Sequence, residues 1–409
     1  MTTLMKTKEG RRIFLFMSLC TMVYFTSYLT RINYGAVITE IIDDMTVTKR
    51  QAGMVSTAAF FTYGVGQLIS GFIGDKVKPR LLIIIGMTAT AVCNILMPFM
   101  GSIAAMTLLW GVNGFCQAMF WPPLVRMMVT HLDKENYNRA CVWVSAASSA
   151  ATIVVYLLAP VCIELSGWKT IFFIGAVGAL LMALAWHLLA PKGDAQPKKP
   201  SADDDSPSIL RNRTIMLMLI PMAVVIILQG ILRDGVTTWM PTLIADTFSF
   251  SSSVSILTGI VLPIFGVFSY NAAAAIQRKL NNEVVTAAVL FGTGAAAALA
   301  LIPLFDKSPA AAVVMMALIT GCMHGVNLML ISRVPPYFRK YGKVSTISGL
   351  LNAFTYVGSS ISTYFVAVLE ESFGWHFTIV TWFVVAAVGT AVCVYCVMRW
   401  KRFLAENEE

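Results

Sequence analysis

The chain has 409 residues, of which 57% are hydrophobic and only 12% charged. A soluble globular domain carries about a quarter charged residues, so this composition argues against a soluble enzyme and predicts that most of the surface faces lipid. The formal net charge of +9 does not indicate nucleic-acid binding, because the Lys and Arg residues recur periodically between apolar segments.

Twelve apolar segments have the length of a transmembrane helix, which needs about 20 mostly apolar residues. The sequence therefore predicts an all-α membrane protein with twelve transmembrane helices and no sizeable soluble domain. The segments lie at 13–38, 51–74, 80–101, 103–129, 138–163, 167–190, 214–245, 252–276, 281–304, 308–332, 344–369 and 375–399.

Basic residues gather in the even-numbered loops and at the two termini, whereas the odd-numbered loops are mainly acidic. Loops rich in Lys and Arg stay in the cytoplasm. This pattern predicts a multi-pass protein with both termini in the cytoplasm. The eight cysteines all lie in apolar segments, where a free cysteine behaves as a small hydrophobic residue, so neither a metal site nor a cofactor is expected.

The loop after the second segment contains Gly71, Asp75, Lys76 and Arg80 in the pattern G-x-x-x-D-K-x-x-x-R. This pattern resembles the signature loop of the major facilitator superfamily, which implies a role in conformational change. The alternative is an ordinary basic cytoplasmic loop that follows a glycine-containing helix.

A charged stretch rich in Pro, Ser and Asp at 191–213 separates six predicted helices from six, and its composition is typical of a linker. The predicted domains are the bundles 1–190 and 214–409. Three features recur at nearly the same distance along the chain, and they predict two pseudo-symmetric six-helix bundles similar to the major facilitator fold. They are Gly167-Trp168 with Gly374-Trp375, Asp75-Lys76 with Arg278-Lys279, and Arg31 with Arg233.

Arg31 and Arg233 lie inside predicted membrane helices, where charged side chains are costly and are candidates for function. A guanidinium group suits bidentate binding of phosphate or carboxylate. Pseudo-symmetry predicts that the two arginines face each other and bind an anion between them. The alternatives are that each extends to its helix end or pairs with an acid such as Asp234. We expect Asp234 not to face Arg233, since adjacent residues on a helix diverge.

Four stretches in both halves resemble the organophosphate:phosphate antiporter family, which includes glycerol-phosphate and hexose-phosphate exchangers and a membrane sensor of hexose phosphate. The resemblance runs nearly end to end. The stretches are Tyr28-Leu29-Thr30-Arg31-Ile32-Asn33-Tyr34, Gln117-Ala118-Met119-Phe120-Trp121-Pro122-Pro123, Arg233-Asp234-Gly235 with Trp239-Met240-Pro241-Thr242, and Phe354-Thr355-Tyr356-Val357-Gly358.

The resemblance implies that Arg31 and Arg233 bind phosphate and that several aromatic and amide side chains line the cavity. Tyr24, Tyr28 and Arg31 are spaced to share one helix face. The alternative for the tyrosines is packing between helices. The remaining cavity residues implied by the resemblance are Tyr63, Gln67, Gln117, Trp121 and Tyr356.

The chain departs from the family at Gln67, where the family has a lysine, and at Ala147, where it has a histidine. These departures predict a less basic cavity, which also fits a bulkier or less highly charged organic anion. His324 lies where the family tends to have tyrosine, and Asn327 follows about one turn on. An imidazole there could bind substrate, titrate near neutral pH, or bond a neighbouring helix.

The sequence predicts a secondary transporter that exchanges organophosphate for inorganic phosphate by rocker-switch alternating access. One alternative is a proton-coupled carboxylate or sugar-acid transporter, with Asp234 or His324 carrying the proton. Another is a transport-inactive membrane sensor of a phosphorylated metabolite. The expected partners are a small anion and the lipid bilayer, with no nucleic acid, and we expect a monomer in a bacterial inner membrane.

Overall fold

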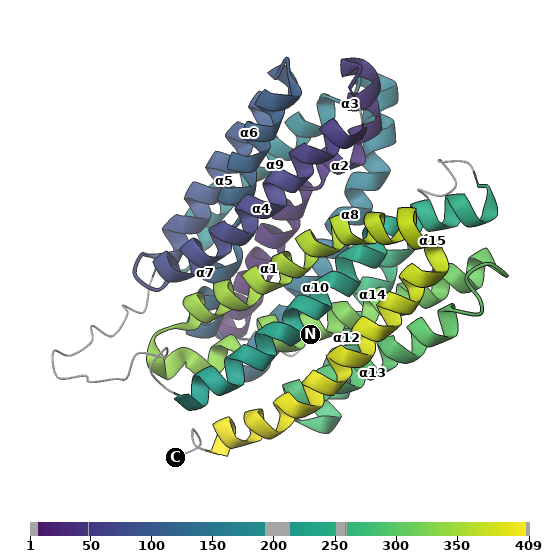
Figure 1. Cartoon of the computed structure of the whole chain (residues 1–409). Helices are drawn as coiled ribbons and strands as arrows, with labels where there is room; N and C mark the ends of the chain where they lie inside the picture. The colour runs from purple at the N-terminus through teal and green to yellow at the C-terminus, as the bar shows by residue number, and fades with distance from the viewer. Residues whose placement is uncertain (1–6, 48, 193–212, 251–257, 259, 406–409) are drawn as a thin grey trace. The chain divides into compact units, whose positions relative to one another are not determined.

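The computed structural model describes residues 7–47, 49–192, 213–250, 258 and 260–405, and these are almost entirely helical (Figure 1). A helix lies over every one of the twelve predicted segments. In chain order the elements are α1 (Lys8–Leu29), α2 (Asn33–Ala36), α3 (Ile38–Met45), α4 (Lys49–Gly74), α5 (Pro79–Leu96), η2 (Met97–Phe99), α6 (Ile103–Gln117), α7 (Trp121–His131), α8 (Lys134–Ser166), α9 (Thr170–Leu189), α10 (Arg213–Phe248), α12 (Val261–Leu280), α13 (Glu283–Leu301), α14 (Pro309–Asn327), η4 (Leu328–Ser332), η5 (Pro335–Tyr341) and α15 (Val344–Ala405).

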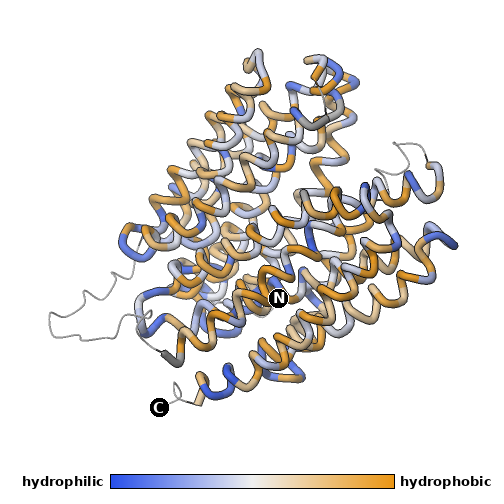
Figure 2. The backbone as a smooth tube through the Cα atoms, viewed as in Figure 1, coloured by the Kyte–Doolittle hydropathy of each residue, from blue (hydrophilic) through white to orange (hydrophobic). Residues whose placement is uncertain are grey.

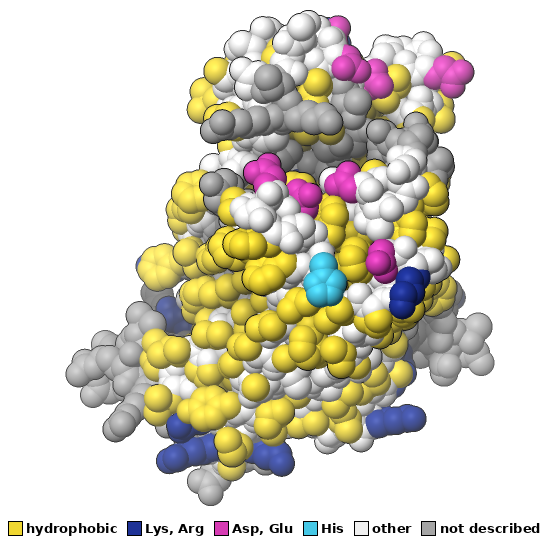
Figure 3. All heavy atoms as spheres, turned by 45° about the vertical axis from the view of Figure 1, so that its right-hand side comes forward, with side chains coloured by type: hydrophobic (Ala, Val, Ile, Leu, Met, Phe, Trp, Pro, Cys, Tyr) yellow, Lys and Arg dark blue, Asp and Glu magenta, His cyan; other side chains and the backbone are white. Residues whose placement is uncertain are grey.

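Within the described residues, nine helices are both long and apolar enough to cross a membrane. The helices α4 and α12 cover two more predicted spans. Hydropathy is highest along the middle of the helices, as Figure 2 shows. Large apolar side chains such as Leu108 (75% exposed) and Leu165 (76% exposed) lie on the outside. On the face drawn in Figure 3, hydrophobic side chains cover the helices, and basic and acidic side chains gather in separate places. Such a surface suits lipid rather than water.

The chain forms two compact units. Unit 1 consists of Met1–Lys199 together with Pro335–Ala353, and unit 2 consists of Pro200–Val334 together with Phe354–Glu409. The start of α15 therefore belongs to unit 1, although the rest of this helix belongs to unit 2. Most of the predicted linker lies outside the described residues, so the division of the chain at 191–213 remains a prediction.

The repeated Gly-Trp pairs occupy equivalent positions in the two units. Gly167 and Gly374 have φ values of +84° and +77°, a conformation that favours glycine. The following indole N–H groups each donate to a carboxylate at 3.1 Å, Trp168 to Asp44 and Trp375 to Asp246. The eleventh and twelfth predicted spans consequently meet at Gly374, inside the single element α15. This geometry confirms the internal repeat that the sequence predicts.

A hydrophobic cluster in unit 1 fixes α2 against its neighbours. The ring centroids of Tyr34 and Trp110 lie 5.9 Å apart, and those of Trp110 and Phe172 lie 5.6 Å apart. The Tyr34 hydroxyl donates to the Ala52 carbonyl oxygen at 2.9 Å, which satisfies its only polar atom in a fully buried site. The residues that directly follow Arg31 are thus held by packing against α4, α6 and α9.

Candidate substrate site

The first membrane segment is interrupted next to Arg31. The helix α1 ends at Leu29, and α2 begins at Asn33. The prediction of one continuous helix over 13–38 is wrong at this point. Neither Gly nor Pro is present between these elements, so the usual sequence signals for a helix break are missing. The interruption depends instead on side chains from other helices.

Three buried asparagines satisfy the backbone at the break. Asn94 Nδ2 and Asn113 Nδ2 donate to the Thr30 carbonyl oxygen at 3.2 and 3.3 Å, and Asn33 Nδ2 donates to Asn94 Oδ1 at 2.7 Å. These side chains are at most 1% exposed. A carbonyl group freed from its helix would otherwise remain unsatisfied in an apolar surrounding. Sequence reasoning missed these residues, although amides within apolar segments are a usable signal.

Gln117 connects α6 to the last turn of α1. Its Oε1 accepts from Ser27 Oγ at 2.7 Å, and its Nε2 donates to Thr30 Oγ1 at 2.8 Å. The side chain is fully buried. Both ends of the predicted cavity amide are therefore engaged with α1, where they brace the turn that carries Arg31.

Aromatic side chains surround the Arg31 guanidinium. Its Cζ lies over the Tyr28 ring at 4.2 Å from the centroid and over the Tyr63 ring at 4.9 Å. The Tyr24 ring lies 5.3 Å from that of Tyr28 and 5.1 Å from that of Trp121. Tyr24 and Tyr28 lie together on α1, and Arg31 contacts Tyr28 from the segment that follows this helix. Cation–π contacts of this kind stabilise a guanidinium group.

Several buried side-chain atoms in unit 1 have no hydrogen-bond partner among the described residues. They include Trp121 Nε1, a donor, and Gln67 Oε1, an acceptor. Gln67 Nε2 donates to the Ala118 carbonyl oxygen at 3.4 Å. Trp121 is 3% exposed and Gln67 is fully buried, so an unmet donor and an unmet acceptor are both costly there. Both could contact a polar ligand.

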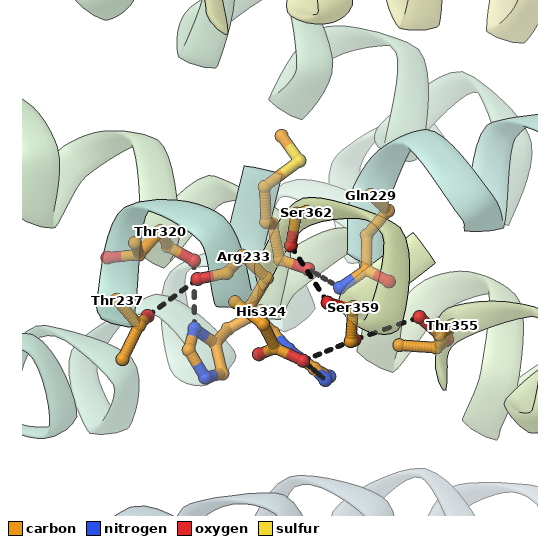
Figure 4. A network of polar contacts seen from close by, with 10 residues as sticks. Gln229, Arg233, Thr237, Thr320, His324, Thr355, Ser359 and Ser362 are labelled. Carbon is orange, nitrogen blue, oxygen red and sulfur yellow. Dashed lines mark hydrogen bonds and ion pairs between the residues drawn. The ribbon is translucent and has the colours of Figure 1, made fainter. Parts of the chain in front are cut away.

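In unit 2, Arg233 pairs with Asp234 (Figure 4). Arg233 Nε donates to Asp234 Oδ1 and Nη2 donates to Oδ2, both at 2.7 Å. The expectation that adjacent residues would not face each other is wrong, because the two side chains meet in these two hydrogen bonds. Ser359 Oγ on α15 donates to Asp234 Oδ2. The side chains of Arg233 and Asp234 are 14% and 30% exposed.

His324 lies on α14 within electrostatic range of both charges. Its Nδ1 lies 2.8 Å from the Thr320 carbonyl oxygen, which can only accept, so Nδ1 carries the proton. Its ring meets the Tyr270 ring at 5.5 Å in an edge-to-face arrangement. Asn327 ends α14 about one turn further on. Tyr356 is buried on α15, where its carbonyl oxygen accepts from Ser360 Oγ at 2.7 Å.

Asp75 in the predicted conformational loop caps the start of α15. Its Oδ1 accepts from the Ser345 backbone N–H at 2.9 Å, and its Oδ2 accepts from the Thr346 N–H at 2.8 Å and Oγ1 at 2.6 Å. Burial raises the pKa of the Asp75 carboxyl, and these donors together with the Arg126 guanidinium oppose that effect. At Gly71 a Cβ would lie 2.7 Å from the Ser345 carbonyl oxygen, so this close helix crossing requires glycine.

Lys76 and Arg80 of the loop make other contacts within unit 1. Lys76 Nζ lies over the Phe72 ring at 3.9 Å from its centroid, and Arg80 donates to the His187 carbonyl oxygen. Arg126 on α7 donates to the carbonyl oxygens of Gly74 and Val77. The loop is thus held at both ends. Gly71 and Asp75 meet the start of α15.

Within the described residues, no group of three His, Cys, Asp or Glu side chains could hold a metal ion. The cysteines are buried free thiols, as predicted.

Comparison with known proteins identifies the family. The family model described as Major Facilitator Superfamily matches residues 20–363. A probable hexose phosphate transport protein of Chlamydia trachomatis is 29% identical over 39% of this chain and 35% of its own length. The membrane sensor protein UhpC of Salmonella typhimurium is 25% identical over 94% of this chain and 90% of its own length. The glycerol-3-phosphate transporter of Bacillus subtilis is 24% identical over 85% of this chain and 84% of its own.

Two solved structures share the fold. The transporter FucP in its outward conformation has a TM-score of 0.71 at 14% identity and covers 94% of this chain and 98% of its own. A bacterial homologue of the iron transporter ferroportin, in an outward-facing state, has a TM-score of 0.76 at 10% identity and covers 94% of this chain and 99% of its own. Because the family model matches residues 20–363, the chain belongs to the Major Facilitator Superfamily, and it is a multi-pass membrane transporter rather than an enzyme.

Proposed function

We propose that this protein exchanges a phosphorylated organic anion for inorganic phosphate by alternating access. The observation that carries the proposal is Arg31 at an interrupted membrane helix, held by the faces of Tyr28 and Tyr63. Interrupted helices near the middle of a membrane protein mark substrate sites in secondary transporters. A guanidinium held there suits the oxygens of a phosphoryl group.

Arg233 is the second proposed ligand of the anion, and it lies at the repeat-equivalent position in unit 2. A buried indole N–H group and a buried amide complete the proposed site in unit 1. Trp121 Nε1 supplies a donor and Gln67 a neutral amide, so the sugar or glycerol part of a substrate can be bound without further positive charge. The similarity to hexose phosphate and glycerol-3-phosphate transporters supports this substrate class.

A membrane sensor of a phosphorylated metabolite is the second candidate. The relative that aligns over 94% of this chain is a membrane sensor protein. Such a protein would bind the same anion at the same arginines but move it slowly or not at all. Binding without flux therefore separates the two candidates.

We also propose that the protein is a monomer in a bacterial inner membrane with both termini in the cytoplasm. The basic loops that contain Lys76 and Arg80 support this orientation, because such loops are retained on the cytoplasmic side. The bacterial relatives named above support the location.

The test is uptake of radiolabelled phosphate into proteoliposomes loaded with phosphate, glucose 6-phosphate or glycerol 3-phosphate. Arg31→Ala and Arg233→Ala are compared with the parent. Arg399→Ala is the matched control, because Arg399 is also held by a tyrosine, with its Cζ over the Tyr395 ring at 5.4 Å, but near the end of α15. We expect exchange in the parent and in the control, and a loss of about a hundredfold or more in each site variant.

Flux that survives in Arg31→Ala would refute the proposed site. Radiolabel binding in detergent that is lost in Arg31→Ala, without flux in any liposome, would favour the sensor. Neither binding nor flux with any phosphate compound would refute the substrate class.

A further inference from the structure

The carboxylate of Asp234 occupies the edge of Arg233 that a bidentate anion would use. The two hydrogen bonds leave from Nε and Nη2 and end on the two different carboxylate oxygens, each at 2.7 Å. This is the paired geometry that guanidinium forms with carboxylate and phosphate ligands. A substrate that binds Arg233 in the same way must first displace Asp234.

We infer that Asp234 is a specificity-determining residue. It allows only an anion with more negative charge than a carboxylate to bind Arg233. The inference rests on the proposed role of Arg233 in substrate binding. It adds a selectivity to that role, because the site then favours phosphate monoesters over monocarboxylates.

The selection follows from competition between an intramolecular and a free anion. Asp234 is adjacent to Arg233 in the chain, so its effective concentration at the guanidinium is high. A monocarboxylate offers the same two oxygens and the same charge, and it gains nothing to offset that advantage. A phosphate monoester carries a charge of about −1.5 to −2 and three acceptor oxygens near neutral pH. It therefore gains Coulomb attraction in a partly desolvated site.

Unit 2 also provides a hydrogen-bond donor for the displaced carboxylate. Ser359 Oγ donates to Asp234 Oδ2 and lies near the Thr355 carbonyl oxygen at 2.9 Å. Ser359 is 5% exposed. A carboxylate left without donors there would be costly, so this hydroxyl lowers the cost of releasing Arg233. Figure 4 shows Ser359 between Arg233 and Thr355.

The first experiment reads the state of Arg233 without any substrate. The purified full-length protein is labelled with phenylglyoxal, and modification of Arg233 is quantified by mass spectrometry of its peptide. We expect labelling in Asp234→Asn to be about fivefold faster or more, because an amide cannot form the charged pair. Thr237→Val is the matched control, since Thr237 Oγ1 donates to the Arg233 carbonyl oxygen and not to the guanidinium. Equal rates in the parent and in Asp234→Asn would overturn the inference.

The second experiment measures selectivity. Exchange of radiolabelled phosphate is inhibited by glucose 6-phosphate or by gluconate, and the ratio of the two inhibition constants is compared between variants. We expect the ratio to favour the phosphate ester in the parent and to fall about tenfold or more in Asp234→Asn, with no change in Thr237→Val. An unchanged ratio in Asp234→Asn would overturn the inference. If the parent does not transport phosphate, the proposed function fails. The phenylglyoxal labelling rates alone then decide whether the Asp234 carboxylate is paired with the Arg233 guanidinium.

Discussion

Removal of the Asp75 carboxylate should release the first turn of α15. This carboxylate accepts from two backbone N–H groups, those of Ser345 and Thr346, and from the Thr346 hydroxyl. Asp75 is 6% exposed and Ser345 is fully buried, so water does not readily replace the lost acceptor. In Asp75→Ala both N–H groups at this helix start lose their partner.

The expected magnitude follows from the number of donors. A buried donor left without a partner costs about 1–3 kcal/mol, so two cost about 2–6 kcal/mol. Loss of a negative charge at a helix N-terminus adds about 0.3–1 kcal/mol. Burial of the Asp75 carboxylate is unfavourable and raises its pKa. The substitution removes this unfavourable term, which offsets part of the sum. Even about 2 kcal/mol corresponds to roughly a 30-fold change in the equilibrium for local opening.

Hydrogen exchange measured by mass spectrometry tests this expectation in lipid nanodiscs. The amides of Ser345 and Thr346 should exchange about 30-fold faster or more in Asp75→Ala. Thr346→Val removes only the hydroxyl donor and should change exchange by less than about tenfold. The Val285 amide, which donates to Asn282 Oδ1 in unit 2, serves as an internal reference. Unchanged exchange at Ser345 and Thr346 in Asp75→Ala would refute the capping role.

Four further substitutions, one of them with a matched control, test contacts within single units. Trp168→Phe and Trp375→Phe each remove an indole N–H bonded to a carboxylate at 3.1 Å. Each variant should lose about 1–2 kcal/mol of unfolding free energy and should have a lower melting temperature in detergent. A melting temperature equal to that of the parent would contradict the repeat contact. Gly358→Ala places a Cβ 2.1 Å from a backbone carbonyl oxygen. The variant should lose about 1–3 kcal/mol of unfolding free energy and have a lower melting temperature in detergent. Gly292→Ala, with its nearest contact at 3.7 Å, should melt like the parent. Gln117→Leu should weaken radiolabelled phosphate binding about tenfold or more, because the turn before the proposed anion site loses two hydrogen bonds; unaltered affinity would argue against that support.

The sequence by itself determined the membrane class, the helical fold and the internal repeat. Hydropathy and charge placement are properties of short segments, so they can be evaluated without knowing how the helices pack. The recurrence of Gly-Trp pairs likewise required only the order of residues, and Trp168 and Trp375 make matching contacts. Arg31 and Arg233 stood out because charged residues are rare in apolar segments, and Tyr24 and Tyr28 followed from helical spacing.

Only the tertiary structure decided how these residues are held. The break before Asn33 depends on Asn94, which lies 64 positions away from Thr30. The donors to Asp75 lie 270 and 271 positions away. The pairing of Arg233 with Asp234 is local in sequence, yet it depends on rotamers that bring both side chains together beside Ser359 on another helix. Spacing along a helix gives the direction in which a side chain leaves the backbone, whereas its hydrogen-bond partners are set by the helices that pack around it.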